Sequence, residues 1–183
     1  VSLMLSPWIL YSRYPASGSV NGALDPIVIP EEYGKANEWL KQQEGAYRVW
    51  WIPQPLGHTW FSWAPENPRP HPWPVIVSSK PILWSSREES RFFLEYLYLQ
   101  GLYEGGIFNL GKALKPYGVA YIVFHDDIKF WQWILHGETG KVSSALSRQK
   151  DLSEAYSTGF IRVLRNNDSG SFIYTSSRLV LVV

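Results

Sequence analysis

The sequence contains no cysteine, and this absence excludes several kinds of site at once. A chain without cysteine has no disulfide framework, no thiolate nucleophile and no cysteine-based zinc site. The sequence also has no run of about 18 apolar residues, the length that a bilayer-spanning helix needs. Its basic residues form no block and its formal net charge is +1, so we expect no nucleic-acid partner.

Other familiar chemical motifs are missing as well. The histidines are dispersed, without a His-x-x-x-His spacing, so no metal site is predicted. There is no Gly-x-Ser-x-Gly elbow for a serine nucleophile and no glycine-rich loop for phosphates. We therefore expect no catalytic residue and no cofactor in this chain.

Aromatic residues, in contrast, are abundant. They make up 16% of the 183 residues, whereas charged residues make up only 18%. Apolar residues reach 45%, enough for a sizeable core in one domain. The aromatic content is compatible with an aromatic-rich core, with a surface that stacks on sugars, or with a surface near a membrane.

The most informative stretch is Val119–Phe124, six apolar residues that follow a turn at 116–118. A short apolar run of this kind predicts a strand buried on both faces, as in layered α/β sheets. Pro30 followed by Glu31 and Glu32 indicates the start of a helix, and Tyr47–Pro53 is the next predicted strand. We predict an α/β (or α+β) fold, with a mixed central sheet, flanking helices, a C-terminal hairpin and a long Pro/Trp-rich loop.

The remaining elements are predicted from the spacing of apolar residues and from the turn-forming residues between them. The pattern indicates helices over 87–102, 107–115 and 142–152, and a short helix over 129–136. A hairpin is expected from 155 to 165, followed by a turn at 166–170 and a strand over 171–175.

The chain divides into two parts. Residues 1–29 are predicted to form an irregular arm, and its apolar start fits either the exit from a membrane helix or an ordinary strand or buried arm. Residues 30–183 are predicted to form a single soluble α/β domain. Both ends are apolar and abrupt, which favours a domain cut from a longer protein.

The segment from Gln54 to Pro81 carries seven prolines, which exclude a helix or a central strand. Loops of this length in a compact domain are usually functional or disordered, and the aromatic content argues against disorder. Stiffly presented aromatic rings can stack on sugars, so candidate ligand contacts are His58, Trp60, Trp63 and Trp73. The alternative is that these tryptophans pack against the domain itself or against membrane helices outside this sequence.

A second candidate follows the central strand. His125, Asp126 and Asp127 lie at its C-terminal edge, where open α/β sheets often bind ligands. Adjacent residues point to opposite faces, however, so three in a row rarely hold one ion. In the alternative interpretation, Asp126 or Asp127 caps the next helix or bonds loop amides.

The order of the segments resembles a known type of domain. The residues that carry the resemblance are Ile29–Tyr33, Trp39–Leu40, Tyr47–Val49 with Pro53, Leu110–Leu114, Tyr117–Val123 with Asp126–Asp127, and Ile161–Asn166 with Phe172–Tyr174. Together they resemble the extracytoplasmic soluble domain that follows the membrane helices of GT-C-type glycosyltransferases. The Trp-Trp-Asp-Tyr-Gly motif of oligosaccharyltransferases is absent, because Trp50-Trp51 is followed by Ile52-Pro53-Gln54.

The resemblance implies a function and a location. It implies a non-catalytic domain at the extracytoplasmic face of the cell membrane, in a protein that assembles envelope glycan or glycolipid. Its partners would be the membrane helices of its own parent and a glycan or lipid-linked sugar, with catalysis performed between those helices. The alternatives are a self-contained carbohydrate-binding module and a free-standing hydrolase that uses His125 with Asp126 or Asp127.

Overall fold

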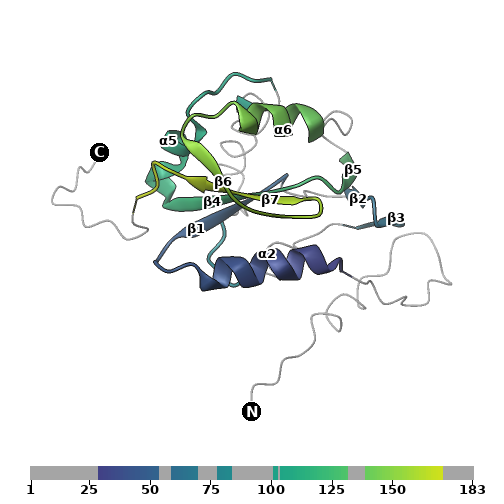
Figure 1. The fold of residues 1–183 in the computed structure, drawn as a ribbon. Helices are drawn as coiled ribbons and strands as arrows, with labels where there is room; N and C mark the ends of the chain where they lie inside the picture. The colour runs from purple at the N-terminus through teal and green to yellow at the C-terminus, as the bar shows by residue number, and fades with distance from the viewer. Residues whose placement is uncertain are drawn as a thin grey trace, which may run out of the picture.

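The computed structural model describes residues 29–53, 59–69, 78–83, 101–102, 104–131 and 139–170, with the backbone alone at 59–60, 64–69, 129–131 and 139. Within these ranges a mixed four-stranded sheet lies between one long helix and two shorter ones, and a three-stranded sheet lies at one end (Figure 1). This arrangement confirms the predicted α/β class. The arm predicted over 1–29, the helix over 87–102 and the strand over 171–175 fall almost wholly outside the described residues.

The main sheet has the order β1-β4-β7-β6. β1 pairs with β4 in parallel, whereas β4 with β7 and β7 with β6 pair antiparallel. β4 therefore lies inside the sheet, which confirms the predicted central strand and explains its apolar sequence. The bounds of these strands are Arg48–Ile52 for β1, Val119–His125 for β4, Leu152–Thr158 for β6 and Ile161–Asn166 for β7.

Helix α2, Glu31–Gln42, covers one face of this sheet (Figure 1). It starts after Pro30, whose φ of −53° already suits a helix, and two glutamates occupy its first turn. Its buried residues Tyr33, Ala36 and Leu40 lie along one stripe and pack on β1, β4 and β7. The helix ends before an extended Gln43, so Gly45, which has a φ of +102°, serves the turn into β1 rather than the helix cap.

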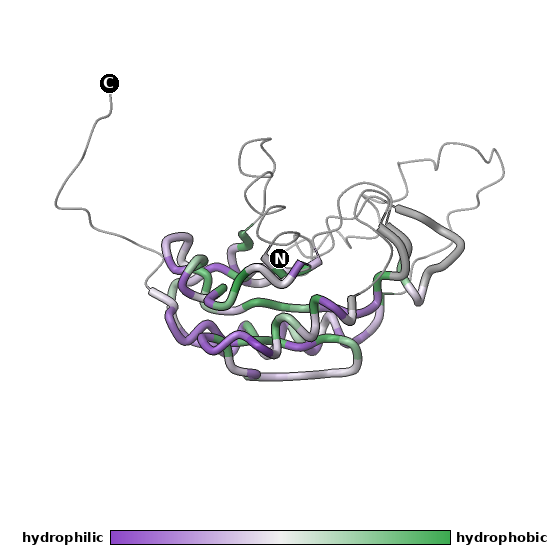
Figure 2. The backbone as a smooth tube through the Cα atoms, turned by 90° about the horizontal axis from the view of Figure 1, so that it is seen from above, coloured by the Kyte–Doolittle hydropathy of each residue, from purple (hydrophilic) through white to green (hydrophobic). Residues whose placement is uncertain are grey.

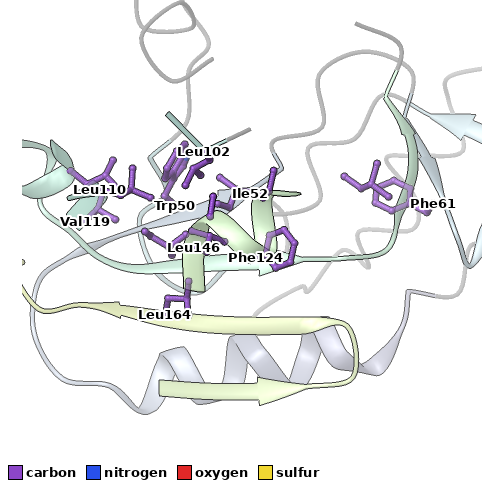
Figure 3. Close-up of a cluster of buried hydrophobic side chains, with 14 residues drawn as sticks. Trp50, Ile52, Phe61, Leu102, Leu110, Val119, Phe124, Leu146 and Leu164 are labelled. Carbon is purple, nitrogen blue, oxygen red and sulfur yellow. The ribbon is translucent and has the colours of Figure 1, made fainter. Parts of the chain in front are cut away.

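The opposite face carries α5, Leu110–Leu114, the 3-10 turn η2, Lys115–Tyr117, and α6, Thr139–Ser147. Trp50 and Ile52 of β1 point into this core, whereas Trp51 points toward α2, as strand alternation requires. Figure 3 shows this core packed around Trp50, with Phe61 of β2 at its far end. Figure 2 shows hydrophobic residues along the inner strands. The buried side chains form two separate clusters, one on each face of the main sheet, so the sheet divides the core into two layers.

The second sheet corrects two predictions. Its order is β3-β2-β5, from β2, Thr59–Phe61, β3, Ala64–Arg69, and β5, Ile128–Trp131. The Pro/Trp-rich segment thus contains a hairpin and is not loop throughout. Two of its prolines, Pro65 and Pro68, lie on β3, an edge strand, where proline is tolerated. The helix predicted over 129–136 is wrong for Ile128–Trp131, because that stretch pairs with β2, a partner far away in sequence.

Two further boundaries differ from the sequence-based prediction. α6 ends at Ser147 and not near residue 152, because Leu152 already begins β6. The C-terminal hairpin is confirmed, with Gly159 at a φ of +51° in the turn between β6 and β7. No helix within the described ranges is both long and apolar enough to cross a bilayer.

Candidate functional site

Four side chains form a polar cluster where the two sheets meet, and we call them the latch cluster: Tyr33, Trp63, His125 and Asp127. Tyr33 comes from α2, Trp63 from the turn between β2 and β3, and His125 and Asp127 from the end of β4 and the link to β5. Tyr33, His125 and Asp127 are each only 1% exposed. The cluster therefore joins three parts of the fold in a dry interior.

Asp127 is the centre of the latch cluster. Its Oδ2 accepts hydrogen bonds from the Tyr33 hydroxyl and the Trp63 indole N–H, each at 2.6 Å. Its Oδ1 lies 2.7 Å from Nδ1 of His125. The backbone carbonyl of Asp127 also accepts from the Ser62 amide at 2.7 Å. One residue thus fixes the turn of the second sheet against the main sheet.

Both ring nitrogens of His125 face acceptors. Nε2 lies 2.9 Å from the carbonyl oxygen of Pro53, and Nδ1 faces the Asp127 carboxylate. Both ring nitrogens thus have an acceptor within hydrogen-bond distance, and in its doubly protonated form His125 makes a buried ion pair with Asp127. The Tyr33 hydroxyl oxygen, 3.2 Å from Nδ1, completes the surroundings of that nitrogen.

Strand alternation explains why, of the three consecutive polar residues at 125–127, the first and the third meet and the second does not. His125 and Asp127 are two positions apart and point to the same side, whereas Asp126 between them is exposed. Among the described residues, Asp126 is held through its backbone amide, which donates to the Phe160 carbonyl at 2.9 Å. The predicted helix cap is wrong, because the element that follows is the strand β5.

Burial and charge shift two pKa values in the latch cluster. Burial, the charge of Asp127 and its hydrogen bond raise the pKa of Tyr33 well above its ordinary value. Burial alone raises the pKa of Asp127, but the charge of His125 and the hydrogen bonds from His125, Tyr33 and Trp63 outweigh it and hold that pKa below its ordinary value. Tyr33 therefore stays a neutral donor and Asp127 a charged acceptor.

The lowered pKa of Asp127 predicts a loss of stability in acid. An aspartate in the unfolded chain has a pKa of about 3.9. Between that value and the lower folded-state pKa, the unfolded state binds the extra proton, so the free energy of unfolding decreases as the pH falls. We expect urea unfolding from pH 6 to pH 3 to show a smaller decrease for Asp127→Asn than for the native chain. Equal decreases would contradict this contribution of Asp127.

The latch cluster has the geometry of a structural tie rather than of a reaction centre. In a hydrolytic His–Asp pair, the histidine nitrogen that does not contact the carboxylate serves a nucleophile. In this chain that nitrogen, Nε2 of His125, is occupied by the backbone carbonyl of Pro53. Within the described residues, no group of three metal-ligating side chains comes together.

The structure brings one of the candidate ligand-contact residues, Trp63, to the end of the central strand. Trp63 is half-buried, its N–H is bound to Asp127 and its ring lies 4.9 Å from that of Phe61. Of Trp60 only the backbone is described, paired with Phe130, and His58 and Trp73 lie outside the described residues. The two candidate sites therefore meet at Trp63.

Sequence reasoning missed Tyr33 as a member of the latch cluster. Its signal was present, since a tyrosine on the buried stripe of a helix needs a partner for its hydroxyl. It also missed a second polar cluster around the start of α5. There Gln149 accepts from the Leu110 amide at 3.0 Å, Asp151 accepts from the Lys112 amide at 2.9 Å, and Asn166 donates to the Gly111 carbonyl at 2.9 Å.

Comparison with known proteins places the fold. No family model matches the chain, and no curated protein matches it. Among solved structures, the arabinofuranosyltransferase AftD from Mycobacteria is similar, with a TM-score of 0.58 and 14% sequence identity over 80% of this chain. Two structures of a mutant of that enzyme give TM-scores of 0.57 and 0.53 at 14% identity, over 79% of this chain.

The match covers only 13% of the enzyme chain, so this chain corresponds to a small part of its length. At this identity the similarity establishes the fold alone. It confirms, for the fold, the resemblance to a domain of a GT-C-type membrane glycosyltransferase.

Proposed function

We propose that this chain is a non-catalytic, extracytoplasmic domain of a membrane glycosyltransferase-like protein that assembles cell-envelope glycan or glycolipid. One observation carries the proposal. The fold matches an arabinofuranosyltransferase over 80% of this chain but over only 13% of that enzyme. A domain of this relative size is a small part of a glycosyltransferase, and its direct partner is the membrane-embedded remainder of its own parent.

The latch cluster supports the non-catalytic part of the proposal. Its acidic residue and its histidine are buried and bound to each other, and the remaining donors are used within the protein. The transfer chemistry would then belong to the membrane part of the parent, while this domain holds the acceptor glycan or the lipid-linked sugar.

The location is tested by cell fractionation with an antibody raised against this chain. We expect a band much heavier than 21.1 kDa in the membrane fraction of the source organism. Protease added to intact spheroplasts should remove the epitope, because the domain faces outward. A soluble band near 21.1 kDa, or an epitope that resists protease until the membrane is opened, would contradict the proposal.

The absence of catalysis is tested with the purified 183-residue chain. With a lipid-linked arabinofuranose donor and an oligoarabinoside acceptor, we expect no product above the protein-free blank. Membranes that contain the full-length parent serve as the positive control and should elongate the acceptor. Elongation by the 183-residue chain alone would show that catalysis resides in this domain.

A further inference from the structure

Three half-buried aromatic side chains and one exposed arginine lie together on the face of the main sheet that α2 covers. We call them the aromatic–arginine patch: Trp39, Tyr121, Tyr156 and Arg165. Trp39 comes from α2, Tyr121 from β4 and Tyr156 from the edge strand β6. Arg165 of β7 is the direct cross-strand partner of Tyr121, so their side chains share this face.

The rings of the patch are held in fixed positions. Trp39 stacks on Tyr156 with ring centroids 5.4 Å apart and planes 12° apart, and it meets Tyr121 at 5.4 Å and 90°. Tyr121 is supported by Tyr47, whose hydroxyl donates to the Leu40 carbonyl at 2.9 Å. Rings held in this way lose little conformational entropy when a ligand binds.

The polar groups of the patch form no hydrogen bond with any part of the chain that the structure describes. Elsewhere tyrosine hydroxyls and arginines have protein partners: Tyr33 and Tyr47 donate to acceptors, and so do Arg148 and Arg162. Within the part of the chain that the structure describes, the hydroxyls of Tyr121 and Tyr156 and the indole N–H of Trp39 form no hydrogen bond. Arg165 likewise forms no hydrogen bond or ion pair there.

We propose that the aromatic–arginine patch is a saccharide-binding site. A sugar presents an apolar C–H face beside a ring of hydroxyls, and it therefore needs aromatic carbon next to free hydrogen-bonding groups. Tyr156 lies on an edge strand with one ring face against Trp39, and no other ring among the described residues contacts it. The guanidinium fork of Arg165 can donate to two neighbouring oxygens at once.

The position of the patch separates it from the latch cluster. Tyr121 and His125 point to the same face of β4 but lie four residues apart, about 13 Å along a strand. The inference deepens the proposed function and rests on it for the source of the saccharide, the glycan of the parent enzyme. The contacts that define the site belong to this chain alone.

The test is a titration of the 183-residue chain with arabinofuranosyl, mannosyl and glucosyl oligosaccharides, followed by two-dimensional NMR. We expect saturable shifts at the patch with at least one of them. Arg165→Ala should raise Kd by about tenfold or more, since a hydrogen bond from a charged group contributes about 1.5–3 kcal/mol. Arg148→Ala is the matched control, because Arg148 is also exposed but lies at the end of α6, beside the opposite core layer, and should leave Kd unchanged.

Three outcomes would overturn the inference. They are the absence of saturable binding to any saccharide, an unchanged Kd in Arg165→Ala, and binding only to phosphatidylcholine or phosphatidylglycerol vesicles, which would mark a membrane-contacting surface instead. Binding to mannosyl or glucosyl but not arabinofuranosyl oligosaccharides would support the site and count against arabinofuranose as the sugar of the parent. A failure of the fractionation experiment would count against the proposed function without affecting the titration.

Discussion

Replacing Asp127 by alanine is expected to lower the free energy of unfolding by about 3–5 kcal/mol, the usual cost of removing one partner from a buried ion pair. The carboxylate is the acceptor for His125, Tyr33 and Trp63 at once. Its removal leaves Nδ1 of His125, the Tyr33 hydroxyl and the Trp63 N–H buried without their shared partner. Urea unfolding followed by tryptophan fluorescence measures this loss, and the midpoint temperature should fall by about 6–20 °C.

The neighbouring residue offers a matched control. Asp126→Ala removes the same type of side chain one position away, but the Asp126 side chain is exposed. Surface substitutions of this kind usually change the free energy of unfolding by less than about 0.5 kcal/mol. A loss smaller than about 1 kcal/mol for Asp127→Ala, or equal losses for the two variants, would mean that the latch cluster does not hold the sheets together.

Gly111→Ala is expected to lower the free energy of unfolding by about 2–4 kcal/mol, although alanine is the better helix former. A methyl group at this position would collide with Oδ1 of Asn166 and lie 3.1 Å from Cγ of Asp151. Asn166 is fully buried and donates to the carbonyls of Gly111 and Val119 at 2.9 and 2.8 Å. Displacing its amide would therefore break the bonds that tie α5 to β4 and β7.

A second glycine gives the opposite sign. Gly34 lies at the end of the first turn of α2, and a methyl group there would meet nothing within 4 Å. Gly34→Ala should therefore stabilise the chain by about 0.5–1 kcal/mol through helix propensity and the restricted unfolded state. If Gly111→Ala also stabilised the chain, the close approach of Asn166 to α5 would be refuted. Chemical denaturation of both variants under the same conditions provides the comparison.

The local sequence pattern was enough to predict those elements whose own residues show their conformation. Val119–His125 is a run of apolar residues after a turn, and any strand with that sequence must be buried. α2 has a proline before its first turn and an apolar stripe along its length. The C-terminal hairpin closes over a few residues around Gly159. In each case the information lies within a dozen neighbouring positions.

Such local patterns do not show which strands pair when the two strands lie far apart in the sequence. The sequence pattern predicts a helix over 129–136 where β5 begins, because a short apolar and aromatic run does not by itself distinguish a helix from a strand. What decides its conformation is the edge that β2 presents, with Phe130 opposite Trp60. The sequence pattern also does not predict the hairpin of β2 and β3, because the prolines in Ala64–Arg69 argue against a strand. An edge strand such as β3 accepts proline, whereas a central strand does not.

The candidate sites show the same division. The sequence pointed to the run His125, Asp126 and Asp127 as a candidate polar cluster and to Trp63 as part of an aromatic segment. Only the folded chain brings Trp63, 64 residues away, and Tyr33, 94 residues away, to the same carboxylate. Only the folded chain sets Arg165 beside Tyr121, where it has no hydrogen-bond or ion-pair partner among the described residues.

The sequence by itself determined the fold class, the central strand, α2 and the resemblance to a glycosyltransferase domain, because each rests on the periodicity and order of neighbouring residues. The tertiary structure alone decided that the polar strand end is a buried tie between two sheets. It alone decided that three aromatic rings and Arg165, which has no partner among the described residues, gather on the face of the main sheet that α2 covers. Hydrogen bonds and ring contacts of this kind depend on which distant segments meet, and that is set by the burial of the two core layers as a whole.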